Sequence, residues 1–107
     1  MKDESESINC PLRRALGALG GKWNLIIIKM IGTKELRFGQ IKRDISDVSE
    51  KVLIEKLKVL ISYDIVIRKD FKEVPPKVSY RLSETGIKAL TIVNEIELFG
   101  SYLKEHP

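Results

Sequence analysis

Apolar residues recur at the spacing of an α-helix in five stretches of the chain, and glycine, proline or serine separates these stretches. Helices are predicted over residues 11–19, 22–31, 38–45, 50–63 and 84–104. Two β-branched and aromatic runs, residues 65–67 and 78–82, predict a pair of strands, and residues 33–36 resemble a very short strand. The pattern therefore predicts an α+β fold that is mostly helical, with a two-stranded hairpin before its last helix.

Residues that typically start or end helices support these boundaries. Pro11 suits the first position of a helix, where a missing N–H leaves no hydrogen bond unmade. Gly20-Gly21 is expected to end the first helix, and Gly32 the second. Ser49 and Ser83 are predicted N-caps, because their hydroxyl groups can accept from backbone N–H groups of the first helical turn. The order of helices, polar turn, further helix and hairpin indicates a winged helix-turn-helix.

The helix predicted over residues 50–63 has one apolar side and one mixed side. The apolar side, predicted to face the core, carries Leu53, Leu57 and Leu60, with Ile54 and Ile61 beside them. The mixed side carries Lys51, Val52, Glu55, Lys58, Val59 and Ser62. Helix-turn-helix proteins place the first turns of their second helix against DNA bases, so the mixed side is the predicted contact surface.

Three residue types on this mixed side suit the major groove of DNA. Lys51 can reach a guanine edge or a phosphate, and Val52 can contact a thymine methyl group. Glu55 is expected either to pair with Lys51 or Lys58 or to accept a hydrogen bond from a cytosine amino group. The alternative is an ordinary solvated helix face.

The predicted hairpin concentrates cations near its tip. Arg68, Lys69, Lys72 and Lys77 lie in or beside a connection that Pro75-Pro76 stiffens and makes a poor edge for a further strand. Arginine at such a tip can enter a narrow minor groove, and either cation can contact the flanking phosphates. The alternative is solubilising charge on an exposed hairpin, but the basic helix before it favours a DNA-binding wing.

Charge is distributed unevenly along the 107 residues. The net charge is +4 at pH 7, and residues 22–81 alone hold 14 cations and 8 anions, an excess of +6. A surface that binds a polyanion such as DNA requires such a local concentration of positive charge. The alternative is a solvated Lys/Glu surface. This length suits one domain spanning residues 1–107, of which residues 1–8 are expected to form a flexible tail.

Several classes of protein are disfavoured by composition. No apolar run approaches the roughly 18 residues of a membrane span, and no signal peptide is recognised, so a cytoplasmic protein without membrane contact is expected. One cysteine and one histidine, His106, cannot build a closed zinc site in one chain, so neither a metal nor another cofactor is expected. No phosphate-binding glycine loop or nucleophile elbow is present, which disfavours an enzyme.

The last predicted helix carries more apolar surface than one small domain covers. Together with the first helix, it is predicted to form a two-fold interface in a homodimer. The predicted interface residues are Leu12, Leu16, Leu19, Ile92, Val93, Ile96, Phe99 and Leu103. The alternative is that this helix curls over its own core.

Several sequence blocks together resemble the HxlR-type winged-helix transcriptional regulators, which are distant relatives of the MarR type. The blocks are Cys10-Pro11, Gly20-Gly21-Lys22-Trp23, Arg37-Phe38-Gly39-Gln40-Ile41, Ser49 with Lys51-Val52-Leu53 and Lys56-Leu57, Glu73-Val74-Pro75-Pro76-Lys77-Val78, and Tyr80 and Leu82 with Gly86. They span about residues 9–100 and are specific in combination. Two departures are Asp64, where glycine is usual at a helix end, and Glu55 with Val59, where longer polar residues are common.

The resemblance implies a cytoplasmic homodimer that binds a pseudo-palindromic double-stranded DNA operator and regulates nearby genes. A winged-helix module that binds an acidic protein is the alternative. The predicted DNA contacts are Arg37, Gln40, Ser49, Lys51, Val52, Glu55, Lys56, Lys58, Arg68, Lys69, Lys72, Lys77 and Arg81. Some members sense oxidants through a cysteine at the position of Cys10, here followed by Arg13 and Arg14, so Cys10 is a candidate redox sensor; a small buried thiol is the alternative.

Overall fold

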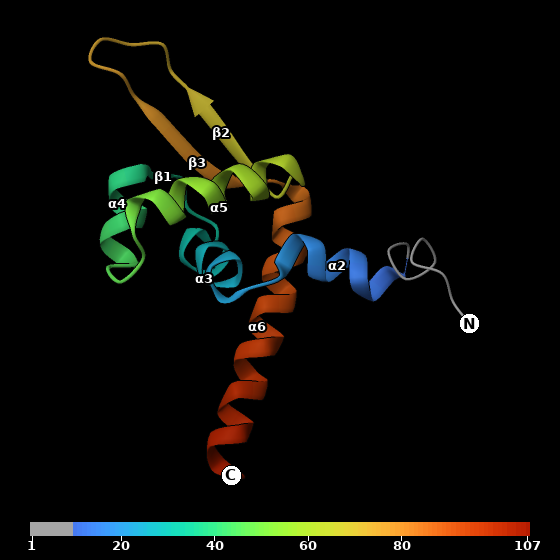
Figure 1. Cartoon of the computed structure of the whole chain (residues 1–107). Helices are drawn as coiled ribbons and strands as arrows, with labels where there is room; N and C mark the ends of the chain where they lie inside the picture. The colour runs from blue at the N-terminus through green and yellow to red at the C-terminus, as the bar shows by residue number, and fades with distance from the viewer. Residues whose placement is uncertain (1–9) are drawn as a thin grey trace.

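The computed structural model describes residues 10–107, so the predicted flexible tail over residues 1–8 lies outside the described residues. Its elements in chain order are α2 (Pro11–Leu19), α3 (Lys22–Ile31), β1 (Leu36–Arg37), α4 (Phe38–Asp44), α5 (Glu50–Ser62), β2 (Val66–Asp70), β3 (Val78–Leu82) and α6 (Glu84–Glu105). Figure 1 shows α3, α4 and α5 gathered beside the base of a β-hairpin, with α2 and most of α6 pointing away from them. The predicted mostly helical α+β fold is confirmed.

The sheet has three antiparallel strands in the order β1-β3-β2, one more than the predicted two-stranded hairpin. β1 pairs with β3 through Leu36 opposite Tyr80 and Arg37 opposite Ser79. The strand predicted over residues 33–36 was misplaced, because Gly32 ends α3 and the amide of Lys34 bonds to the carbonyl of Ile31 in a turn. The extended backbone therefore begins only at Leu36.

Both predicted serine caps are confirmed. The Ser49 hydroxyl accepts from the amide of Val52 at 3.1 Å at the start of α5, and the Ser83 hydroxyl accepts from the amide of Gly86 at 3.0 Å at the start of α6. Each satisfies one of the N–H groups that a first helical turn leaves without a partner. These caps fix where both helices begin.

The carboxyl end of α5 explains how aspartate replaces the usual glycine. Asp64 adopts a left-handed φ of 60°, which short polar side chains tolerate better than most. The amide of Asp64 bonds to the carbonyl of Ile61, and the amide of Ile65 bonds to the carbonyl of Leu60, each at 2.9 Å. This pair of bonds closes α5 and turns the chain into β2.

The core lies where α3 and α5 meet the sheet and the first half of α6. Its fully buried side chains come from α3, α4, α5, the turn before α5 and the start of β2, and they include Ile27, Ile28, Ile31, Ile41, Val48, Leu53, Leu60 and Val66. The leucine stripe predicted for α5 is confirmed, because Leu53, Leu57 and Leu60 are at most 2% exposed. This stripe fixes the rotation of α5 about its axis and hence the side that faces solvent.

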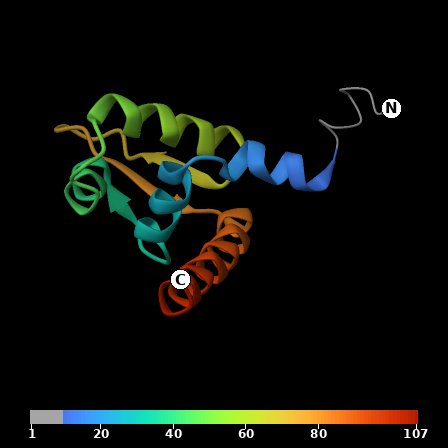
Figure 2. The same cartoon turned by 60° about the horizontal axis from the view of Figure 1, so that its bottom comes forward.

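The first and last helices project from this core (Figures 1 and 2). No side chain of α2 is fully buried among the described residues, but Ala18 and Leu19 at its carboxyl end are half-buried against the core. A side-chain amide joins α2 to α3, since Asn24, which is 3% exposed, donates from Nδ2 to the carbonyl of Ala18 at 3.0 Å. The carboxyl-terminal end of α2 therefore contacts the core.

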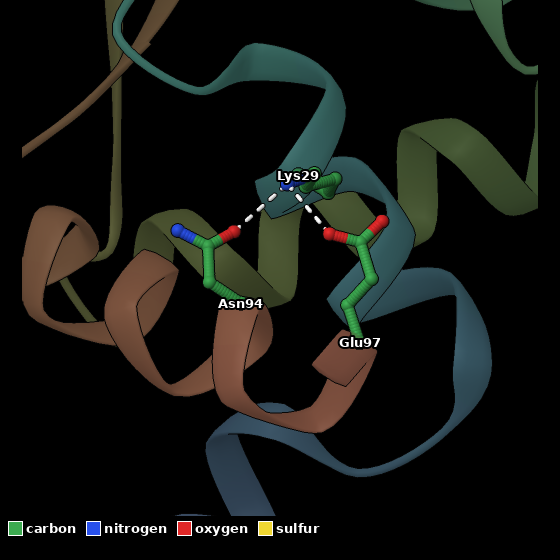
Figure 3. Close-up of polar contacts among 3 residues, drawn as sticks. All are labelled: Lys29, Asn94 and Glu97. Atoms are coloured by element: carbon green, nitrogen blue, oxygen red, sulfur yellow. Dashed lines mark hydrogen bonds and ion pairs between the residues drawn. The ribbon is translucent and has the colours of Figure 1, made fainter. Parts of the chain in front are cut away.

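A polar contact and two buried residues hold α6 to α3. The ammonium group of Lys29 lies 2.8 Å from Oδ1 of Asn94 and 2.9 Å from Oε1 of Glu97 (Figure 3). Ala89 and Val93 are each 6% exposed and belong to the core. The prediction of Val93 as an interface residue was therefore wrong, because Val93 falls on the side of α6 that packs against the subunit's own core.

Candidate nucleic-acid interface

The solvent side of α5 carries most of the polar residues predicted for it. Lys51, Glu55, Lys58 and Ser62 are exposed. Val52, predicted to point outward, is half-buried and packs against the core, so only part of its side chain is available to a thymine methyl group. The exposed face of α5 is therefore charged, with Val52 at its apolar edge.

Two expectations for α5 need adjustment. Ile54 was predicted to face the core but is 40% exposed, because Leu53 and Leu57 occupy the direction toward α3 and leave Ile54 at the side. Within residues 10–107, no ion pair joins Glu55 to Lys51 or Lys58. Glu55 is thus not neutralised by either lysine in the subunit.

Side chains alternate between the two faces of the hairpin, so the cations predicted to bind DNA lie on opposite faces of it. Val66, Arg68, Tyr80 and Leu82 lie on the face toward the core and α5, since Val66 and Leu82 are buried there and pair across β2 and β3. Arg68 and Tyr80 line a groove of about 220 Å³ together with Ile54, Leu57, Lys58 and Ile61. Arg68 therefore lies near Lys58 and apart from the other wing cations.

The opposite face of the sheet is here called the open face. It carries Arg37, Ser79 and Lys69 in one row across the three strands, because Arg37 pairs with Ser79 and Ser79 with Lys69. Arg81 is also on this face but near its base, where it lines a hollow of about 240 Å³ beside the turn after α3 and the start of α6. The structure thus brings Arg37 and Lys69 together and separates Arg81 from them.

Beyond the paired strands, residues 71–77 form the tip of the hairpin. The amide of Phe71 bonds to the carbonyl of Lys77 at 2.9 Å, and the amide of Lys72 bonds to Oδ1 of Asp70 at 2.8 Å. The second bond supports the left-handed φ of 54° at Lys72. Val74 is 99% exposed, so its side chain packs against nothing in the described subunit. Lys72 is exposed at this tip, as predicted.

A depression of about 350 Å³ lies between the wing and the start of α4. Its lining residues are Glu35, Arg37, Gln40, Phe71, Lys77 and Ser79. Arg37, Gln40 and Lys77 were singled out from the sequence, whereas Phe71 was missed. The register of β2 and β3 would have revealed it, because continuing their pairing by one residue sets Phe71 opposite Lys77.

The remaining predicted contacts on α5 are Ser49 and Lys56. Ser49 is exposed, and its oxygen serves the helix cap, which leaves the hydroxyl hydrogen to donate to another group. Lys56 is half-buried on the flank of α5. Because Ser49 is held in the helix cap and Lys56 is partly covered, both side chains are less available to DNA than those of Lys51 and Lys58.

Cys10 occupies the N-cap position of α2 and is partly exposed. The backbone N–H groups of Arg13 and Leu12 lower the pKa of its thiol below the ordinary value, and the Arg13 guanidinium adds to this effect, whereas desolvation opposes it. Beside Cys10, residues of α2, the end of α5 and the start of α6 line a hollow of about 350 Å³: Pro11, Arg14, Ala15, Ala18, Tyr63, Ile65 and Thr85. Pro11, which directly follows Cys10, belongs to this largely apolar lining.

Most of the predicted interface residues present apolar surface to solvent. Leu12 and Leu16 on α2 are 68% and 57% exposed, and the predicted residues of α6 that are exposed are Ile92, Ile96, Phe99 and Leu103. Leu98 and Tyr102, which were not predicted from the sequence, are also exposed. Leu19 is half-buried against the core and contributes less than predicted.

Within residues 10–107, no helix combines the length and apolar character that crossing a bilayer requires. Residues 18–107 match the family described as HxlR-like helix-turn-helix. A protein of Fusobacterium mortiferum described as regulatory protein MalR is 33% identical over 99 residues, which cover 92% of this chain and 93% of that protein.

Two solved structures share the arrangement. A transcriptional regulator assigned to the MarR family, from Porphyromonas gingivalis W83, is 40% identical with a TM-score of 0.83, covering 94% of this chain and 95% of that chain. The oxidised form of the redox regulator HypR is 31% identical with a TM-score of 0.81, covering 87% of this chain and 96% of that chain. The chain therefore belongs to the HxlR-like helix-turn-helix family of transcriptional regulators.

Proposed function

We propose that the whole chain acts as one cytoplasmic, sequence-specific double-stranded DNA-binding domain that regulates transcription by recognition rather than by catalysis. The observation that carries this proposal is the orientation of α5. Its leucine stripe is buried, so Lys51, Glu55 and Lys58 face solvent at the surface that helix-turn-helix proteins present to the major groove. The wing beside α5 supplies further cations for adjacent phosphates.

We infer that the active form is a homodimer. The described subunit leaves a set of large apolar side chains exposed on α2 and α6, and soluble proteins seldom leave such a set in water. A second copy related by a two-fold axis would cover the same patch on both subunits. It would also place two α5 helices in successive major grooves about 34 Å apart, which predicts a pseudo-palindromic operator.

Selection of bound fragments from random DNA, followed by titration of the selected fragment at several salt concentrations, tests the proposal. A protein that contacts 6 to 10 phosphates loses roughly 10³ to 10⁵ in affinity between 50 and 200 mM salt. The selected fragments should share an inverted repeat and should bind more tightly than scrambled fragments of the same length at every salt concentration. Binding without any preference among sequences would favour the alternative, a module that binds an acidic protein.

A second candidate function is redox control of this binding through Cys10. Its lowered thiol pKa favours the reactive thiolate, and a structural neighbour is described as a redox regulator. Because the chain has one cysteine, a protein disulfide would have to join two subunits, or Cys10 would have to react with a small molecule. Peroxide or a quinone should weaken operator binding by the wild type and leave Cys10→Ser unaffected; equal responses would exclude Cys10 as the sensor.

A further inference from the structure

The Phe71 ring lies within cation–π distance of the ammonium groups of two lysines on the wing. Nζ of Lys69 is 4.5 Å from the centre of the Phe71 ring, and Nζ of Lys77 is 4.2 Å from it. We propose that Phe71 is a positioning residue for DNA binding: its ring holds Lys69 and Lys77 so that, with Arg37, they seat one backbone phosphate. This inference rests on the proposed DNA-binding function.

The backbone explains why these side chains meet. Lys69 lies in β2, and Phe71 follows it by two residues where the pairing with β3 continues, so their side chains lie on the same face. The bond from the Phe71 amide to the Lys77 carbonyl continues the pairing of β2 with β3 and sets Phe71 opposite Lys77. The ring therefore receives one lysine from its own strand and one from the neighbouring strand, on the open face that also carries Arg37.

Phe71 has no role in the core that would account for an aromatic residue here. It is half-buried, and it is not among the partly buried apolar side chains that pack against the core. The tip that follows it is exposed, with Val74 at 99%. The contact of the ring with the two lysines is therefore the interaction that distinguishes phenylalanine from an aliphatic residue at this position.

The chemistry of this contact suits a lysine that must bind an anion. The face of an aromatic ring attracts a cation through its quadrupole without supplying a negative charge. Within residues 10–107, neither Lys69 nor Lys77 has a carboxylate partner. Each ammonium group therefore keeps its full charge for a phosphate while losing part of its freedom of motion.

The residues that line the depression beside Phe71 include the other side chains that could bind a phosphate. Arg37 and Gln40 line it opposite Phe71 and Lys77. Oε1 of Gln40 accepts from the amide of Arg37 at 2.9 Å, which leaves the Nε2 group of Gln40 to donate. The Glu35 carboxylate, also in the lining, accepts a hydrogen bond from the hydroxyl of Ser79. Arg37, Gln40 and Lys77 thus supply cationic and donor groups around this space, where Glu35 contributes one negative charge against two positive ones.

The test compares the wild type with Phe71→Leu and Phe71→Tyr in titrations of the selected DNA fragment at several salt concentrations. Leucine keeps the apolar bulk without the aromatic face, so affinity should fall about two- to five-fold per wing, as an exposed cation–π contact predicts. The slope of log affinity against log salt should flatten by about 0.9 for each phosphate that the wing no longer neutralises. Tyrosine keeps the aromatic face and should restore both quantities.

A graded series separates the ring's electrostatics from its shape. Replacing Phe71 by phenylalanines with one, two and three ring fluorines weakens the attraction for cations with little change in size, so affinity should fall stepwise. In a variant that lacks both Lys69 and Lys77, Phe71→Leu should have no further effect. A normal slope in Phe71→Leu, equal losses in the leucine and tyrosine variants, or additive losses with the lysine changes would overturn the inference. A wild type that binds no DNA would instead overturn the proposed function, and this inference with it.

Discussion

Gly86 lies so close to Ile65 that a Cβ atom at position 86 would be 2.2 Å from the carbonyl oxygen of Ile65 and 2.9 Å from the Cβ of Leu82. The first of these neighbours is backbone, which cannot move aside as a flexible side chain does. Gly86→Ala should therefore destabilise the protein by about 3 kcal/mol, through forced separation of α6 from the segment that leads into β2. Urea unfolding at a fixed protein concentration measures this change.

Gly100→Ala is the matched control within the same helix. Apart from the chain neighbours and the helix's own backbone, no described atom lies within 4 Å of a Cβ built on Gly100. Alanine should therefore leave stability unchanged or raise it by about 0.5–1 kcal/mol through its better helix propensity. Equal destabilisation by both substitutions would show that the approach of Gly86 to Ile65 is not what constrains α6.

The Ser49 cap should contribute measurably to the stability of the fold. Removing the hydroxyl in Ser49→Ala leaves the amide of Val52 without its partner and should cost about 1 kcal/mol. Ser46→Ala is the control, since Ser46 is exposed and its hydroxyl is not part of a helix cap. Urea midpoints at constant slope compare the two variants, and an equally large destabilisation in Ser46→Ala would contradict the capping role.

Lys51 and Lys72 should affect DNA binding in different ways. Lys51→Ala should cost about 1–3 kcal/mol on the selected fragment and relax the preference at one base position, because Lys51 lies in the first turn of α5. Lys72→Ala at the wing tip should weaken binding to all fragments alike and flatten the salt slope by about one for each phosphate left without its cation. Fluorescence anisotropy with single-base variants of the fragment distinguishes these outcomes.

The exposed Lys88 on α6 is a control for charge alone. Lys88→Ala should leave both affinity and base preference close to those of the wild type. If the lysine changes in α5, the wing and α6 all weakened binding in parallel, α5 would contribute charge without reading bases.

The pH dependence of Cys10 alkylation should report its lowered thiol pKa. Only the thiolate reacts with iodoacetamide, so the rate should reach half its maximum at a lower pH in the folded protein than in urea. Unfolding removes the N–H groups of Arg13 and Leu12 that favour the thiolate, which gives the shift its direction. A midpoint that does not change on unfolding would show that the helix end does not activate the thiol.

An apolar residue on α6 should be required for the proposed homodimer. Ile96→Glu places a charge in the exposed apolar set and should shift the sedimentation equilibrium toward monomers. Thr91→Glu places the same charge at an exposed position outside the predicted interface set and should leave the equilibrium unchanged. A dimer that survives Ile96→Glu would place the interface elsewhere.

The features that depend on neighbouring residues along the chain could be predicted from the sequence. The α5 stripe and the caps at Ser49 and Ser83 follow from short-range spacing and turn chemistry. Ile54 was misassigned because it lies at the edge of the α5 stripe, and Val93 because apolar residues occur on several sides of α6, so that tertiary packing alone decides which of them the core covers.

The open face of the sheet depends on contacts between distant parts of the chain. Arg37 reaches Ser79 and Lys69 only through the pairing of β1 with β3 and of β3 with β2. A two-stranded wing was predicted, so Arg37 and the wing lysines were assigned separately and Phe71 received no role. The register of the three strands places Arg37, Lys69 and Phe71 on the same face of the sheet.

The two-residue repeat of the wing strands also limits which changes of length the protein can accept. One residue inserted directly after Val66 would invert every later side chain of that strand, sending Lys69 to the face beneath α5 and Arg68 to the open face. A residue added at the unpaired turn around Val74 would leave both strands in phase. Insertions and deletions among homologous chains should therefore gather at the turn and avoid the strands, a pattern that an alignment of their lengths can check.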